Sequence, residues 1–349
     1  MKILINTPHL SLAGGVANHY KGLKPYWNEK VIYNKIGKRS EKSGNGVYWL
    51  PFDIVKFIVK IIFLQPDIIL LNPSLGKSAI KRDFLFLKIA KLFGKKTAIF
   101  FHGFNTDTDT IKYLNTEYLR NNLNKCECIL ILAKEFANIV KSWGVTVPIH
   151  LTTTKVDNRL IDGFDIATKN YNTQNILFLA RIEKAKGIYT ALDAVKILQE
   201  KDKGIKFRVA GTGGELKKAK QYAIDNNIAV DFLGSISGDT LINEFNTANV
   251  YILPTHGEGM PTSVLEAMAF GLPIITRPVG GICDFFENDK MGLLIESLDP
   301  QEYAKVIESY INNPLKNKEI SIYNYNYAMK NFMASQVASK IENILKQYE

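Results

Sequence analysis

The chain has 349 residues, of which 46% are apolar and 22% are charged. This balance is typical of a globular protein and excludes a disordered or fibrous chain, and the length is sufficient for two domains that each bury a core. The net charge of +10 is uneven, because residues 1–165 hold 24 Lys and Arg against 13 Asp and Glu, whereas residues 166–349 hold 20 against 21. An anionic partner would therefore be attracted by the first half of the chain.

The sequence predicts neither a signal peptide nor a membrane-spanning helix. The N-terminus turns polar at Asn6, and the most apolar stretch, residues 54–71, is interrupted by lysines, a proline and an aspartate. We therefore expect a cytoplasmic protein, and association with the inner face of the cytoplasmic membrane stays open. The three cysteines lack the spacing of metal ligands and are interpreted as reduced structural thiols.

In the first half, short apolar runs alternate with helical patterns, as in a parallel sheet covered by helices. Strands are expected over residues 2–6, 67–71, 97–101 and 128–132, and helices from Val16 and over residues 78–93. This rhythm predicts a Rossmann-like domain over residues 1–165, which we expect to bind the acceptor of any reaction catalysed.

The predicted helix over residues 78–93 combines an apolar stripe with many cations. The cations on the helix and around it are Lys77, Lys81, Arg82, Lys88, Lys91, Lys95 and Lys96. Such a mixture suits an anionic membrane surface or a phosphorylated acceptor. The alternative is a solvated helix face above an ordinary buried stripe.

A polar stretch over residues 156–173 has the composition of a linker. Beyond it, strands are expected over residues 175–179, 206–210, 229–233, 250–253 and 273–276, with helices between them. The rhythm matches that of the first half and predicts a second Rossmann-like domain over residues 166–334. A final helix, within residues 335–349, is expected to pack back on the first domain.

The most specific pattern lies in residues 253–273, where a buried strand leads through a Gly-rich loop into a helix that starts near Pro261 or Thr262. Backbone amides at such a helix terminus bind anions or sugar hydroxyls. Two carboxylates, Glu258 and Glu266, frame the turn, and Glu266 on a half-buried helix needs a partner because an unpaired charge there is costly.

Cations and paired glycines follow other predicted strands. Arg181 and Lys186 come directly after the strand over residues 175–179, so they project from the carboxyl edge of the second sheet, where such sheets bind ligands. Two fixed cations there would stabilise negative charge on a bound ligand. Gly14 and Gly15 follow the first strand and would let the backbone approach a phosphate.

Together these segments resemble glycosyltransferase family 4, and the block over residues 253–273 follows that family's E-x7-E pattern. The resemblance implies an α/β chain of the GT-B fold, in which two Rossmann-like domains face each other across a donor-binding cleft. It implies that Glu266 holds the donor ribose, Glu258 the hydroxyls of the transferred sugar, and Arg181 with Lys186 the donor pyrophosphate.

The resemblance extends to the expected donor-binding set and to a histidine. Gly15 would lie across the cleft from Arg181, and His102, which follows the strand over residues 97–101, would face the transferred sugar unless it is a satisfied structural histidine. The nearby Asp107 and Asp109 are candidates for acceptor binding. The expected donor-binding residues are Gly14, Gly15, Gly211, Ile236, Gly259, Met260, Pro261, Thr262 and Glu266.

The resemblance implies a retaining transfer of a hexose or N-acetylhexosamine from a nucleoside diphosphate sugar, with UDP-sugars favoured. The acceptor would be a hydroxyl of a glycan or lipid-linked acceptor in cell-surface polysaccharide synthesis. We expect no metal and no other cofactor, since no Asp-x-Asp lies at the end of a predicted strand. We also expect no nucleic-acid partner. The alternatives are a sugar phosphorylase or nucleotide-sugar epimerase of the same fold, or a non-catalytic basic protein that binds membranes or nucleic acid.

Overall fold

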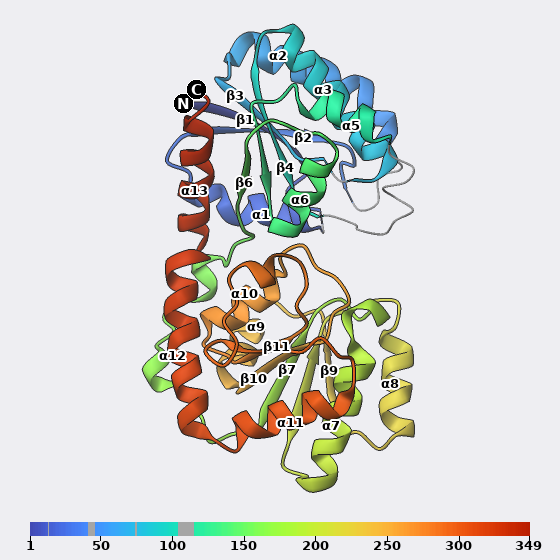
Figure 1. Cartoon of the computed structure of the whole chain (residues 1–349), viewed down its shortest axis with the longest axis vertical. Coiled ribbons are helices and arrows are strands. Elements are labelled where there is room, and N and C mark those ends of the chain that lie inside the picture. The colour runs from blue at the N-terminus through green and yellow to red at the C-terminus, as the bar shows by residue number, and fades with distance from the viewer. Residues whose placement is uncertain (13, 41–45, 74, 104–114) are drawn as a thin grey trace. The chain divides into compact units, whose positions relative to one another are not determined.

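The computed structural model describes residues 1–12, 14–40, 46–73, 75–103 and 115–349 (Figure 1). The chain forms two compact units, Met1–Lys155 with Ala334–Glu349, and Val156–Met333. The second unit therefore starts before residue 166, where the composition placed its boundary. The reason is packing, because Val156 pairs with Met333 and the ring of Phe164 contacts that of Phe270.

The first unit is built on a parallel sheet of six strands in the order β2-β1-β3-β4-β5-β6. Its strands are β1 (Lys2–Pro8), β2 (Lys30–Ile36), β3 (Ile68–Leu71), β4 (Lys96–Phe101), β5 (Cys128–Ile131) and β6 (Ile149–Leu151). The central strands are continuous apolar runs that are buried on both faces, as a sheet covered by helices on both sides requires.

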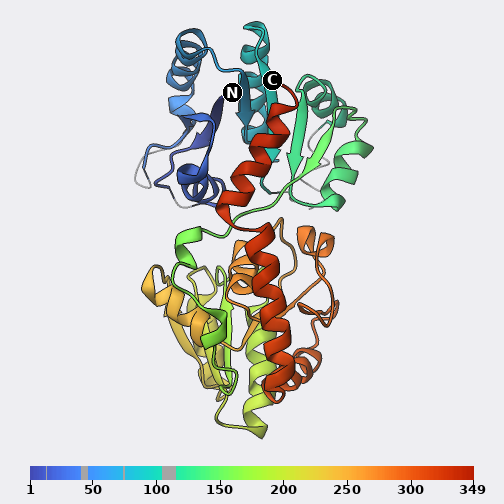
Figure 2. The same cartoon turned by 90° about the vertical axis from the view of Figure 1, so that its left-hand side faces the viewer.

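Helices cover both faces of this sheet. They are α1 (Gly15–Leu23), α2 (Leu50–Leu64), α3 (Lys77–Leu92), α5 (Thr116–Leu123), α6 (Lys134–Ser142) and α13 (Ala334–Lys346), with short 3-10 turns η1 (Lys24–Tyr26) and η2 (Gly46–Trp49). One core joins α2, α3, α5 and α6 to one face of the sheet. Helix α13 packs beside α1 and runs close to the N-terminus (Figure 2).

The second unit is also a parallel sheet of six strands, in the order β12-β11-β10-β7-β8-β9. The strands are β7 (Asn175–Leu179), β8 (Lys206–Ala210), β9 (Asp231–Gly234), β10 (Val250–Leu253), β11 (Ile274–Thr276) and β12 (Gly292–Leu294). The helices are α7 (Ile188–Lys201), α8 (Leu216–Asp225), α9 (Asp239–Thr247), α10 (Thr262–Ala269), α11 (Pro300–Ile311) and α12 (Pro314–Asn331). Shorter 3-10 turns are η3 (Asn158–Leu160), η4 (Ile166–Thr168), η5 (Lys184–Lys186) and η6 (Gly280–Asp284).

The two sheets share their layers but differ in strand order. Counted within its own unit, the second sheet has the order 3-2-1-4-5-6 of dinucleotide-binding folds, whereas the first has 2-1-3-4-5-6. The prediction of two Rossmann-like domains is confirmed, although the expectation that both are built alike holds only for the layers. In each sheet the direction of the crossovers reverses at one point. The reversal lies between β1 and β3 in the first sheet and between β7 and β10 in the second. Ligands of such sheets bind at the reversal point.

None of the helices in the described residues has the length and apolar character that crossing a bilayer requires.

Candidate active site

The reversal point of the second sheet brings together two charged side chains that are far apart in sequence. Lys186 ends the turn η5 after β7, and Glu258 lies on the loop after β10, the neighbouring strand. Their Nζ and Oε1 atoms are 2.6 Å apart, and the side chains are only 15% and 13% exposed. Such a shielded ion pair keeps more of its attraction than a pair on the surface.

The loops that carry this pair are held against each other by backbone contacts. The amide of His256 donates to the carbonyl of Ala185 at 2.8 Å. Gly187, which follows Lys186, has a φ of +75°, and a Cβ there would lie 2.1 Å from the carbonyl oxygen of Pro254. Only glycine allows this approach, so the position of Lys186 depends on the next residue.

A third loop, after β11, supports Glu258. The amide of Gly281 donates to the carbonyl of Gly259 at 2.8 Å, and Gly280 has a φ of +55°. A Cβ on Gly280 would lie 2.1 Å from the carbonyl oxygen of Glu258. The backbone of Glu258 is therefore fixed from the side of η6 as well as from the side of β7.

Helix α10 begins at Thr262, as the sequence predicts, with Pro261 at the preceding position and Met260 buried beside it. Glu258 and Glu266 lie near the same group, since both carboxylates raise the pKa of the Tyr251 hydroxyl, after the larger effect of burial. The two glutamates of the E-x7-E pattern thus both lie within electrostatic reach of the Tyr251 hydroxyl, which contacts Ser263 in the first turn of α10.

Tyr251 itself was not identified by the sequence analysis. Its ring is buried in β10, and its hydroxyl contacts the carbonyl of Leu179 at 2.9 Å and the hydroxyl of Ser263 at 2.7 Å. It therefore ties the end of β7 to the first turn of α10. The signal in the sequence was a tyrosine inside an apolar strand, because a buried phenol needs a partner.

Arg181 is placed differently from Lys186. Its side chain is 72% exposed and pairs with Glu183 of the same loop at 2.8 Å. A surface pair of this kind contributes little to stability, so the guanidinium can leave it for a stronger anion. The structure therefore brings Lys186 and Glu258 together but leaves Arg181 at the exposed rim of the loop.

The glycine turn after β8 packs against the Arg181 loop. Gly211 has a φ of +135°, and a Cβ there would lie 1.9 Å from the carbonyl oxygen of Ala180. The amide of Gly211 donates to the carbonyl of Gly234 at the end of β9, two residues before the half-buried Ile236. Close backbone packing thus accounts for this glycine, whether or not a nucleotide binds beside it.

In the first unit, His102 lies at the carboxyl edge and is part of a hydrogen-bonded set. Asn72, which follows β3, donates through Nδ2 to the carbonyl of Asn6 at 2.7 Å, so its Oδ1 is the acceptor. That oxygen accepts from the hydroxyl of Tyr20 at 2.6 Å and lies 2.9 Å from Nε2 of His102. Nε2 must therefore carry the hydrogen, and Nδ1 keeps a lone pair.

Burial lowers the pKa of His102 to about 3, so the imidazole is neutral near pH 7. It stacks edge-on against His19, which is buried and whose pKa burial also lowers. A neutral His102 suits a hydroxyl better than a phosphate, because it offers one acceptor and no charge.

Gly14 and Gly15 lie at the start of α1, after β1. A Cβ on either would meet no atom within 4 Å, so packing does not require glycine at these positions, although Gly14 has a φ of +154°. Open backbone at a helix N-terminus is the arrangement that admits an anion. Asp107 and Asp109 lie outside the described residues.

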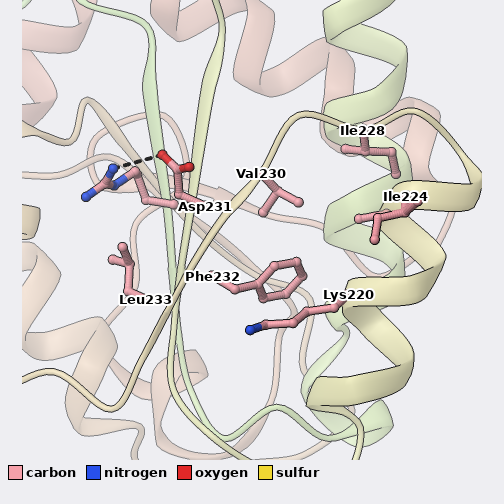
Figure 3. A pocket seen from close by; sticks show the side chains of 9 residues that line it. Lys220, Ile224, Ile228, Val230, Asp231, Phe232 and Leu233 are labelled. Carbon is pink, nitrogen blue, oxygen red and sulfur yellow. Dashed lines mark hydrogen bonds and ion pairs between the residues drawn. The ribbon is translucent and has the colours of Figure 1, made fainter.

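The described residues hold no group of three or more His, Cys, Asp or Glu side chains arranged to bind a metal ion. A pocket of about 540 Å³ opens beside the edge strand β9 of the second sheet (Figure 3). It is lined by Arg208, Lys220, Ala223, Ile224, Ile228, Val230, Asp231, Phe232 and Leu233. Its lining holds none of the predicted site residues, so this pocket is not the candidate site.

Comparison with known proteins identifies the family that the second unit resembles. Residues 164–327 match the model of a family described as glycosyl transferases group 1, and this stretch holds all the second-unit loops described above. The capsular polysaccharide biosynthesis glycosyltransferase CapM of Staphylococcus aureus is 28% identical over 210 residues, which are 59% of this chain. The match spans about half of CapM, 54% of its length.

Two solved structures have the same fold over nearly the whole chain. Sucrose-phosphate synthase from Thermosynechococcus elongatus superimposes with a TM-score of 0.78 at 15% identity, covering 99% of this chain and 98% of that one. Anabaena HepE in complex with UDP and glucose gives a TM-score of 0.73 at 15% identity, covering 99% and 100%. The chain therefore has the two-domain GT-B fold, and its second unit matches the glycosyl transferases group 1 model.

Proposed function

We propose that the protein is a glycosyltransferase that moves a hexose or N-acetylhexosamine from a nucleoside diphosphate sugar to a hydroxyl of a glycan or lipid-linked acceptor. The observation that carries the proposal is the shielded Lys186–Glu258 pair at the reversal point between β7 and β10. The match of residues 164–327 and the likeness to CapM support it and point to cell-surface polysaccharide synthesis.

The donor is proposed to be UDP-linked, which the UDP and glucose bound to HepE support. Lys186 has three donor hydrogens, so it can hold Glu258 and a diphosphate oxygen together. The carboxylate of Glu258 keeps an oxygen for a sugar hydroxyl. Arg181 is proposed to leave Glu183 for the diphosphate, and Glu266 to accept the ribose hydroxyls beside the amides of α10.

In the proposed reaction the bond between the sugar C1 and the diphosphate oxygen breaks while the acceptor oxygen bonds to C1 on the same face. The acceptor proton passes to the leaving diphosphate, and configuration at C1 is retained. Lys186 and Arg181 stabilise the negative charge that gathers on the diphosphate, in place of a metal ion. The neutral His102 is proposed to accept a hydrogen bond through Nδ1 from a sugar or acceptor hydroxyl.

The test uses the purified chain with a panel of UDP-sugars, scored by thermal stabilisation and by release of UDP. Lys186→Met is expected to lower turnover by roughly 100-fold or more, the usual loss when one group that stabilises transition-state charge is removed. Lys184→Met is the matched control, because Lys184 lies in the same turn η5 and is exposed. The proposal fails if no nucleoside diphosphate sugar binds or reacts, or if the two variants behave alike.

Product analysis separates other chemistry of the same fold. A phosphorylase would release a sugar 1-phosphate only when phosphate is supplied, and an epimerase would change the donor sugar without releasing UDP. A transferase does neither, and its product carries the sugar on the acceptor.

A further inference from the structure

The first unit exposes a continuous set of large apolar side chains on η2 and α2. The most exposed are Tyr48 at 84% and Phe63 at 79%. The full set, here called the α2 patch, is Val47, Tyr48, Trp49, Phe52, Val55, Val59, Ile62 and Phe63. Isolated exposed apolar residues are ordinary, but an apolar face of this length indicates a binding surface.

Helix α2 has two apolar faces, and folding uses only one of them. Asp53, Phe57 and Ile61 lie four residues apart and are buried against the sheet. The exposed residues Phe52, Val55, Val59, Ile62 and Phe63 follow a helical spacing of three and four, so they form a second stripe on the other side. Packing within the unit does not explain this second stripe.

The aromatic end of the patch is held in place. Arg39 lies over the rings of Trp49 and Phe52, 4.8 Å and 5.6 Å from their centroids. The same guanidinium pairs with the buried Asp53, which also accepts from the amide of Gly37 at 2.8 Å. The two aromatic rings are therefore fixed at the surface by a buried anchor.

Cations border the patch, and the only acidic residue in residues 46–64 is the buried Asp53. Lys56 and Lys60 lie next to the exposed stripe, and the Nζ atom of Lys60 donates to the carbonyl of Tyr33 at 2.7 Å. Both lysines have lowered pKa values. Burial is the main cause, and Lys35 adds to it in both cases; the pKa of Lys60 falls to about 8. These cations repel one another, so an anionic surface would relieve their repulsion.

Helix α3 lies beside α2 (Figure 1). Its end is joined to the end of α2 by a hydrogen bond from Lys95 to Gln65. Leu92 at this end is 84% exposed, next to the 39% exposed Phe93 and near the exposed Lys88. Two of the cations that the sequence placed on and around α3, Lys88 and Lys95, thus lie near apolar residues that it did not identify as exposed.

We propose that η2 and α2 dock in the plane of an anionic lipid bilayer, with the α2 patch in the interface and the bordering lysines at the lipid headgroups. A helix that combines an apolar face, aromatic residues at one end and flanking lysines fits this location. With 15 residues, α2 is too short to span a bilayer.

A protein partner fits the surface less well, because the bordering charge is of one sign and matches a phospholipid surface without any specific pairing. Because η2 comes after β2, it lies at the carboxyl edge of the first sheet, the same edge as His102. Docking would bring that edge to the bilayer, where a lipid-linked acceptor would be met. The docking itself does not rest on the proposed function.

The test measures co-sedimentation of the full chain with vesicles of phosphatidylcholine, with and without about one third phosphatidylglycerol. The variant carries Phe52→Gln, Val59→Gln and Phe63→Gln, which keep helix propensity at exposed positions. It is expected to bind the anionic vesicles at least about ten-fold more weakly than the unaltered chain. The matched control carries Ile224→Gln, Leu315→Gln and Ile322→Gln, at exposed apolar positions of the second unit, and is expected to bind normally.

Two further measurements make the result specific. Brominated lipids are expected to quench tryptophan fluorescence in the unaltered chain and to lose most of that effect in Trp49→Phe. Lys56→Gln with Lys60→Gln is expected to weaken binding to anionic vesicles and leave binding to neutral vesicles unchanged. UDP-sugar stabilisation is expected to be the same in all these variants, so a failure of docking is distinct from a failure of the proposed function.

The proposal is overturned if the Phe52, Val59 and Phe63 variant binds vesicles as well as the unaltered chain. It is also overturned if the chain binds no vesicles and instead forms a dimer that this variant disrupts, since the patch would then be covered by a second copy.

Discussion

Replacing Gly280 by alanine should disturb Glu258 without removing any functional atom. The alanine Cβ would lie 2.1 Å from the carbonyl oxygen of Glu258 and 2.6 Å from that of Gly259, whereas such contacts essentially never fall below 3.0 Å. The loop after β10 must therefore move by about 1 Å. Because Glu258 lies 2.6 Å from Lys186, a movement of this size breaks or distorts their ion pair.

Gly280→Ala should lower both the stability and the turnover rate, and a control variant separates these two effects. Alanine in a left-handed conformation costs about 1–2 kcal/mol of unfolding free energy. A catalytic group displaced by 1 Å costs about 100-fold in rate. Gly163, also in the second unit, has a φ of +75° against +55° at Gly280, and a Cβ there would meet no atom within 4 Å. Gly163→Ala should therefore show only the first effect.

The assay compares urea unfolding and UDP release for both variants, at the donor that stabilises the unaltered chain most. Both should lose stability, Gly280→Ala the more because its Cβ also displaces backbone, and only Gly280→Ala should lose about 100-fold in turnover. If Gly280→Ala turns over normally, or if Gly163→Ala loses as much activity, then the backbone clamp on Glu258 does not govern the reaction.

Two further predictions concern buried polar groups. Tyr251→Phe removes contacts to Leu179 and Ser263 and should lower the unfolding free energy by about 1–2 kcal/mol in urea titrations; an unchanged midpoint would contradict its role as a tie. Burial lowers the pKa of Lys169 from 10.5 to about 7, so the unfolded chain binds more protons between these values and stability should rise with pH there. The unfolding free energy should rise by roughly 3 kcal/mol between pH 7 and pH 9.5 in urea titrations of the unaltered chain, and this rise should be absent in Lys169→Met. If the unfolding free energies of the two proteins change equally with pH, Lys169 is not the titrating group.

Local patterns in the sequence were sufficient to predict most of the strands and helices of the second unit. The strand that became β7, the start of α10 at Thr262 and the cations after β7 were all predicted, because a few neighbouring residues determine strand periodicity and helix starts. The same reasoning assigned no strand to Lys30–Ile36 and no role to Tyr251. In the first unit, sequence-based reasoning singled out the basic side chains of α3 as a binding surface and did not identify the exposed face of α2. The reason is that α2 has apolar residues on all sides, and such a pattern does not show which face is buried.

Three features were decided only by the tertiary structure. Strand order placed β7 beside β10 and so joined Lys186 to Glu258 across 72 residues, an arrangement that local periodicity does not encode. Backbone approach explained Gly187 and Gly280, which in the sequence are ordinary turn glycines. Residues 156–168 pack as part of the second unit, which therefore begins at Val156, although their composition is typical of a linker. The sequence by itself thus determined the candidate residues of the proposed sugar-nucleotide site. Long-range packing decided which of them meet, because contacts between distant loops depend on the order of the strands that carry them.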